Sequence, residues 1–117
     1  MNREIAKRWV AALRSGEYRQ GDGLLRRDNK FCCLGVLCDL YDKEHFTPAE
    51  SHWVDESGYR QDPSTLEFYV LPLAVRDWAE VDSRNPRVYD TVLSKMNDSG
   101  AKFSEIAALI DQYIEEL

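Results

Sequence analysis

Long hydrophobic runs are missing from this 117-residue sequence. No apolar stretch approaches the ~20 residues that a membrane-spanning helix needs, so we expect no contact with a membrane. The first residues are charged and amphipathic, unlike the apolar core of a signal peptide, and we therefore expect a cytoplasmic protein. With 44% hydrophobic residues the chain can still form the core of one domain, residues 1–117.

Positive charge is also scarce. Fifteen Lys and Arg stand against 21 Asp and Glu, a net charge of −6 that argues against a nucleic-acid partner. The charge is uneven, because residues 1–30 hold eight Lys/Arg and four Asp/Glu, whereas residues 31–117 hold seven and seventeen. The basic N-terminal third can bind a small anion, or it can pack against the acidic remainder of its own chain.

Cysteine and histidine are few, with three and two copies. Structural zinc sites usually combine two short Cys or His pairs, and none is present, so we predict no metal and no cofactor. Cys33 or Cys38 could act as a nucleophile with His45 or His52 as its base. Neither histidine belongs to a recognisable motif, and an enzyme is therefore less well supported than a binding protein.

What the chain does contain is one strongly apolar window, Phe31–Tyr41, which includes all three cysteines. The polar residues 28–30 before it predict a turn, and hence a hairpin over residues 24–33. Apolar residues at helical spacing then predict a buried helix over residues 34–42. Gly35 disfavours a helix, so we expect another backbone to approach it closely. The cysteines should be reduced and buried, packing as small hydrophobes.

The rest of the chain is mostly helical in pattern. Residues 3–15 are predicted to form a first, amphipathic helix, with Trp9 as a core residue and Gly16 as its left-handed cap. Proline starts predict two more helices, one from Pro72 to about Glu80 and one after Asn85-Pro86. The second should turn four residues inward: Tyr89, Val92, Leu93 and Met96. The last helix begins near Ser104 and continues towards Leu117.

A small sheet completes the predicted fold. Leu66–Leu71 is rich in β-forming residues and is expected to add a strand to the hairpin over residues 24–33. The prediction is therefore an α+β domain with about five helices, helix dominant, and a small antiparallel sheet.

Two irregular stretches could build a binding site. The loop Gly16–Gly23 can present backbone N–H groups to an anion, although glycine more often marks a simple connector. Residues 43–65 show no periodicity, and a loop of this length is often functional, although its aromatic residues could equally pin it to the core. Arginine and aromatic residues of these stretches and the hairpin are the predicted ligand-binding set: Tyr18, Arg19, Gln20, Arg26, Arg27, Trp53 and Tyr59.

Five short motifs occur in order along the chain, each of them once. They are Ser15–Gly21 (S-G-x-Y-x-Q-G), Cys32–Cys38 (C-C-L-G-V-L-C), Leu71–Trp78 (L-P-x-x-V-x-x-W), Asn97–Gly100 (N-D-x-G) and Phe103–Ile110 (F-x-x-I-A-x-x-I). Together with the preceding tryptophan helix they resemble a family of small uncharacterised proteins of bacteriophages and bacteria. The resemblance covers most of the chain except about residues 43–68. It implies a phage or prophage source and carries no established activity.

These observations lead to a binding function. We expect a non-enzymatic phage-type accessory protein that acts against a host defence or other host system by sequestering a small anionic, nucleotide-like ligand. The alternative is a protein–protein inhibitor that covers a basic surface of a host protein with its acidic body. The site of action would be the host cell cytoplasm if the protein is phage-encoded, and a homodimer is compatible with either function.

Overall fold

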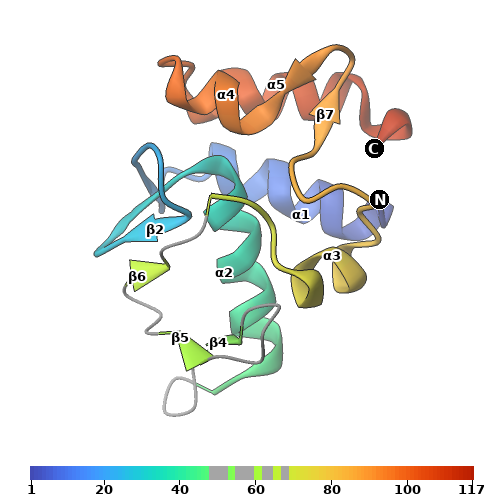
Figure 1. Cartoon of the computed structure of the whole chain (residues 1–117). Coiled ribbons are helices and arrows are strands. Elements are labelled where there is room, and N and C mark those ends of the chain that lie inside the picture. The colour runs from blue at the N-terminus through green and yellow to red at the C-terminus, as the bar shows by residue number, and fades with distance from the viewer. Residues whose placement is uncertain (48–52, 55–59, 62–64, 67–68) are drawn as a thin grey trace.

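The computed structural model describes residues 1–47, 53–54, 60–61, 65–66 and 69–117, and Figure 1 shows their arrangement. The helices in these ranges are α1 (Arg3–Arg14), α2 (Cys33–His45), α3 (Leu73–Ala79), α4 (Leu93–Asp98) and α5 (Phe103–Gln112), followed by the 3₁₀ turn η1 (Ile114–Glu116). The strands are pairs of residues: β1 (Arg19–Gln20), β2 (Arg26–Arg27), β3 (Lys30–Phe31), β4 (Trp53–Val54), β5 (Arg60–Gln61), β6 (Thr65–Leu66), β7 (Arg87–Val88) and β8 (Thr91–Val92). The predicted α+β class with a helical majority is confirmed.

Helix α2 runs through the centre of the molecule. It packs against α1, α3 and α4, and it runs down from the level of α1 towards β4 and β5 (Figure 1). Trp9 of α1 is fully buried, and its indole Nε1 donates a hydrogen bond of 2.9 Å to the carbonyl oxygen of Cys33. All three cysteines are buried and unpaired with one another. The predicted roles of Trp9 as a core residue and of the cysteines as buried side chains are confirmed.

Gly35 shows how α2 is held against the hairpin. A Cβ atom at this position would overlap the backbone carbonyl oxygen of Leu25, the residue before β2. Only glycine allows this approach, which places the start of α2 directly on the backbone of the hairpin. The close backbone contact predicted at Gly35 is therefore confirmed, and Gly16 likewise has the predicted left-handed conformation, with φ of 76°.

The predicted hairpin is present, but the sheet differs from the expectation in two respects. Its strand order is β1-β3-β2-β6, and β1 pairs with β3 in parallel, so the sheet is mixed rather than antiparallel. The strand added to the hairpin is β6 at residues 65–66, so Leu66 of the predicted strand Leu66–Leu71 belongs to it and residues 69–71 do not. Leu71 is buried outside any strand, where it joins the core just before α3. The apolar character of Leu71 thus indicated burial rather than ladder pairing, whereas Tyr69 of the same stretch is 63% exposed.

The helix predicted after Pro86 is wrong over its first half. Residues 87–92 form the antiparallel hairpin β7–β8, and α4 begins only at Leu93. The β-branched residues Val88, Thr91 and Val92 favour strands, which explains why the helical periodicity did not prevail. Tyr89 therefore lies at a turn with φ of 54° and is 70% exposed, whereas it was expected to point inward.

Smaller differences concern element ends. Helix α2 extends to His45, beyond the predicted residue 42, and α5 stops at Gln112 before the 3₁₀ turn. Within the stretch 43–65, expected to be irregular, β4 and β5 form an antiparallel pair. No helix in the described ranges is long and apolar enough to cross a membrane.

Candidate functional site

The hairpin β2–β3 separates two arginines that the sequence had grouped together. Arg26 pairs in register with Phe31, and Arg27 pairs with Lys30. Neighbouring residues of a strand project to opposite faces of the sheet. The guanidinium of Arg26 accordingly lies 4.8 Å from the ring centroid of Phe31, and its Nε donates a 2.8 Å hydrogen bond to the carbonyl oxygen of Asp28.

Arg27 and Lys30 line an open pocket of about 480 Å³ on the other face. Three chain segments form its walls: the glycine loop before the hairpin, the hairpin itself, and the turn after α4. The lining residues are Gln20, Gly21, Asp22, Leu24, Arg27, Lys30, Asn97, Gly100 and Ala101. Arg27 and Lys30 are both exposed, so their charged ends are available to a ligand from solvent.

Asn97 holds the pocket walls together from below. It is 3% exposed, and its Oδ1 accepts hydrogen bonds from Gln20 Nε2 at 2.9 Å and from the backbone N–H of Cys33 at 3.2 Å. Its Nδ2 donates to the carbonyl oxygen of Gly21 at 2.9 Å. One side chain thus joins the glycine loop, the start of α2 and the end of α4. We call this arrangement of Gln20, Cys33 and Asn97 the junction.

Gln20 completes the junction. Its Nε2 also donates to the carbonyl oxygen of Ala101 at 2.7 Å, and its Oε1 accepts from the backbone N–H of Phe103 at 3.1 Å. Its amide group therefore anchors the glycine loop to the start of α5. Gln20, which was predicted to bind ligand, therefore also holds together the segments at the base of the pocket.

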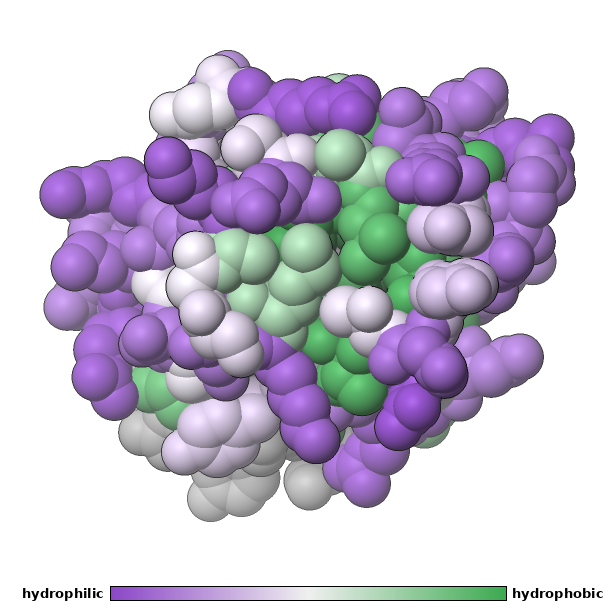
Figure 2. Space-filling model, turned by 90° about the horizontal axis from the view of Figure 1, so that it is seen from above, coloured by the Kyte–Doolittle hydropathy of each residue, from purple (hydrophilic) through white to green (hydrophobic). Residues whose placement is uncertain are grey.

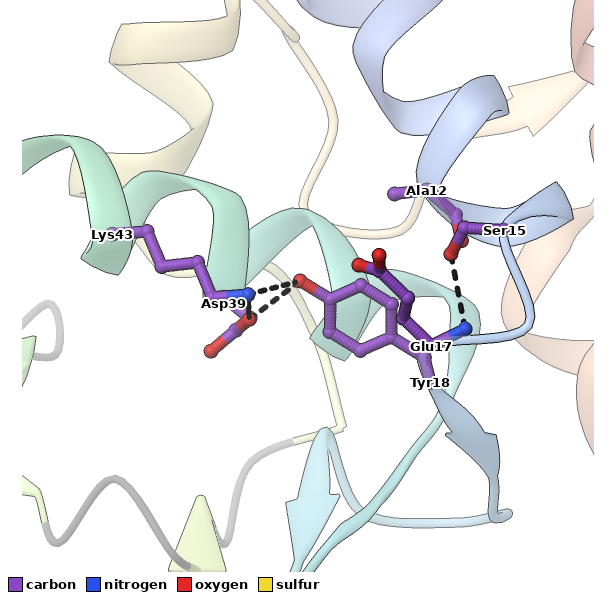
Figure 3. A network of polar contacts seen from close by, with 6 residues as sticks. All are labelled: Ala12, Ser15, Glu17, Tyr18, Asp39 and Lys43. Atoms are coloured by element: carbon purple, nitrogen blue, oxygen red, sulfur yellow. Dashed lines mark hydrogen bonds and ion pairs between the residues drawn. The ribbon is translucent and has the colours of Figure 1, made fainter.

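Tyr18 takes part in a separate polar network, shown in Figure 3. Its hydroxyl donates to Asp39 Oδ2 at 2.6 Å and accepts from Lys43 Nζ at 3.2 Å, while Lys43 also pairs with Asp39 at 3.2 Å. Burial, together with the hydrogen bond to Asp39, raises the pKa of Tyr18 to about 12. The ring packs edge-on against Phe31, with ring centroids 5.0 Å apart. Tyr18 is thus placed with Arg26 and Phe31 rather than among the pocket-lining residues.

The remaining predicted site residues are not gathered at the pocket. Arg19 is exposed on β1. The backbone of Trp53 belongs to β4, and Tyr59 lies outside the described residues, so neither aromatic side chain can be assigned to the site. Among the members of the predicted ligand-binding set whose side chains the structure describes, Gln20 and Arg27 line the pocket.

The basic residues of α1 behave differently from those of the hairpin. Ion pairs join Arg3 to Glu115, Arg8 to Glu44 at 3.0 Å, and Arg14 to Asp111 at 3.6 Å. The arginines of α1 therefore pack against the acidic remainder of the chain, as one of the two sequence interpretations proposed. In the described part of the chain no ion pair engages Arg27 or Lys30.

The cysteines are poorly suited to nucleophilic chemistry. Burial raises the pKa of the Cys32 thiol to about 11 and that of Cys33 and Cys38 well above the ordinary value. Little thiolate, the reactive form, therefore exists near neutral pH. His45 is exposed on α2 and stacks on Tyr41, with ring centroids 4.2 Å apart, while His52 lies outside the described residues. Among the residues that the structure describes, no three or more His, Cys, Asp or Glu side chains gather as a metal site.

A comparison with known protein families finds a match that includes all the residues of the pocket and the junction. A family model described as "Domain of unknown function (DUF8296)" matches residues 1–114. The chain belongs to the DUF8296 family. No curated protein and no solved structure matches it.

Seven of the nine pocket-lining residues of this DUF8296 chain lie outside the predicted ligand-binding set: Gly21, Asp22, Leu24, Lys30, Asn97, Gly100 and Ala101. The sequence did contain an indication of these residues, because Gln20-Gly21 and Asn97–Gly100 belong to two of the five motifs. Asp98 of the second motif also reaches the glycine loop, where its Oδ1 accepts from the backbone N–H of Gly23 at 3.0 Å. Two motifs separated by more than seventy residues meet at one pocket, which only the tertiary structure brings together.

Proposed function

We propose that this DUF8296 chain binds a small anionic ligand at the pocket beside Arg27 and Lys30. The observation that carries the proposal is the cross-strand pairing of these two cations. Like charges directly opposite each other in a sheet are destabilising. An anion between them would replace this repulsion with two charge-assisted contacts, because a guanidinium binds an oxyanion with two parallel N–H groups and an ammonium adds a point charge.

The surroundings support a binding site rather than a catalytic one. The junction beneath the pocket uses its polar groups for hydrogen bonds within the protein, and the thiols are buried with raised pKa values. We propose a non-enzymatic protein that sequesters its ligand, with nucleotide-like anions as the ligand class. The resemblance to bacteriophage proteins supports the further proposal that it acts as an accessory protein against a host defence or other host system.

Calorimetric titration at physiological ionic strength tests the site. The probes are inorganic phosphate, pyrophosphate and nucleoside mono-, di- and triphosphates. Each charged hydrogen bond contributes about 1.5–3 kcal/mol, so Arg27→Ala should weaken binding by roughly tenfold or more. Lys30→Ala should weaken it through the loss of the second cation.

The hairpin offers a matched control. Arg26→Ala removes the same charge one residue away, on the face that packs against Phe31, and should leave the affinity unchanged. Equal losses from Arg26→Ala and Arg27→Ala would indicate a general electrostatic effect and contradict the proposed pocket. Absence of binding by every anion up to millimolar concentration would overturn the proposed function.

A further inference from the structure

A second surface lies over α4, α5 and the hairpin β7–β8, away from the pocket residues Arg27 and Lys30. Figure 2 looks down on this side of the molecule and shows hydrophobic residues at its middle, with hydrophilic residues around them. Leu109 and Tyr113 are partly buried and pack against the core cluster. Tyr113 is the residue that follows α5, and its backbone N–H donates a 3.2 Å hydrogen bond to the carbonyl oxygen of Leu109, so the two residues lie on the same side of the helix end.

Tyr89 extends this apolar region from the hairpin. Its ring stacks on Tyr113, with centroids 5.2 Å apart and an angle of 21° between the planes. Tyr89 is nevertheless 70% exposed, and its φ of 54° is a conformation that bulky residues rarely adopt. An exposed aromatic side chain held on a strained turn is a reason to look for a binding role. We call Tyr89, Leu109 and Tyr113 the tyrosine face.

The charges of this region suit a second copy of the same chain. Two copies with a net charge of −6 would repel each other through most of their surfaces. Tyr89 is flanked in its hairpin, however, by two exposed residues of opposite charge, Arg87 and Asp90. A two-fold axis places the same surface on both partners, so a face with charges of both signs at its edge can be complementary to itself.

We propose that the tyrosine face is the interface of a homodimer, with Tyr89 as its central anchor. Tyrosine is enriched among the residues that contribute most to protein–protein binding, because it buries a large rigid ring and retains a polar hydroxyl. In the dimer, the ring of Tyr89 leaves water against the partner's copy of the same face. This proposal does not depend on ligand binding in the pocket.

Sedimentation equilibrium over a wide concentration range tests the proposal, with Tyr89→Gly as the main variant. Glycine adopts the φ of this turn without strain, and this gain offsets the loss of the stacking contact with Tyr113, so the stability of the variant should stay close to that of the wild type. It should nevertheless weaken dimerisation by roughly tenfold or more, the effect expected for an interface anchor. A tyrosine with only a structural role would not separate stability from association in this way.

Leu109→Lys provides a second disruption of the tyrosine face and should also favour the monomer. The matched control is Leu73→Lys on α3, a leucine that is 46% exposed outside the tyrosine face and should leave dimerisation unchanged. A wild-type protein that stays monomeric at all concentrations would overturn the proposal. So would a dimer that persists with wild-type affinity in Tyr89→Gly and Leu109→Lys proteins whose circular dichroism spectra match the wild type.

Discussion

The junction and the cationic edge of the hairpin lie on the same pocket and differ in almost every physical respect. In the junction, Asn97 is buried, and its amide joins the glycine loop and the start of α2 to its own helix α4. At the hairpin edge, Arg27 and Lys30 are exposed and face each other with the same charge. The hydrogen bonds of the junction stabilise the folded state, whereas the repulsion between Arg27 and Lys30 at the hairpin edge destabilises it.

This difference separates stability from binding within a single pocket. A buried group left without its hydrogen bonds costs the full desolvation free energy, whereas an exposed charge can be removed with little effect. Substitutions should therefore change the free energy of unfolding strongly at the junction and at the nearby backbone contact of Gly35, moderately at the half-buried Tyr18, and weakly at the hairpin edge. Four substitutions sharpen or contradict this gradient.

The largest effect is expected for Gly35→Ala. In an ordinary helix this change stabilises by about 1 kcal/mol, but here the new Cβ would overlap the carbonyl oxygen of Leu25. Because backbone must move to relieve the overlap, we expect a loss of about 4 kcal/mol or more, or no folded protein at all. Urea unfolding followed by circular dichroism measures this loss.

Gly23→Ala is the control. A Cβ at Gly23 would have no atom near it, but its φ is 78°, so the change should cost only about 1 kcal/mol. Equal losses would mean that α2 does not need this close approach.

Asn97→Ala should follow, with a loss of about 2–4 kcal/mol, because it leaves the buried N–H of Cys33 and the carbonyl of Gly21 without their partner. The same unfolding measurement applies. Asn85→Ala removes a single side-chain contact, in which Asn85 Oδ1 accepts from Ser94 Oγ at 2.7 Å, and should cost about 1 kcal/mol or less. A loss at Asn97 no greater than that at Asn85 would show that the junction does not stabilise the fold.

Tyr18 should make stability depend on alkaline pH. The folded protein raises its pKa from 10.0 to about 12, so the stabilisation is fully present below pH 10 and is lost as the pH rises towards 12. Ultraviolet absorbance should show one of the six tyrosines ionising near pH 12, a component that Tyr18→Phe removes. The raised pKa values of the buried thiols act in the same direction, and the difference between wild type and Tyr18→Phe isolates Tyr18. A difference between the two curves that appears near pH 10 rather than near pH 12 would contradict the network with Asp39.

The smallest effect on stability is expected for Arg27→Ala. Removing one of two like charges should leave the free energy of unfolding within about 0.5 kcal/mol of the wild type, or raise it slightly at low salt. Arg8→Ala is the comparison, because it breaks an ion pair with Glu44 at 3.0 Å and should lower stability by up to about 1 kcal/mol. Unfolding at low and high salt measures both. A loss of several kcal/mol for Arg27→Ala would make it a structural residue and weaken the proposed binding site.

Local chemistry determined a large part of this fold. The stripe around Trp9, the apolar cysteine window, the cap at Gly16 and the turn before Lys30 each depend on neighbours a few residues away, and each was predicted correctly. Gly35 could be interpreted from the sequence because a glycine inside a helix has few explanations other than close packing. The error after Pro86 arose where two local patterns, helical periodicity and β-branched residues, gave conflicting indications.

Tertiary structure alone decided what the pocket is. Gln20 and Asn97 are 77 positions apart, and their hydrogen bond has no counterpart in local sequence. The different surroundings of Arg26 and Arg27 also depend on distant segments. Those segments decide which face of the hairpin is covered and which face lines the pocket. Composition determined that a basic N-terminal third meets an acidic remainder. Long-range packing decided that the arginines of α1 would be paired there and that Arg27 and Lys30 would face solvent.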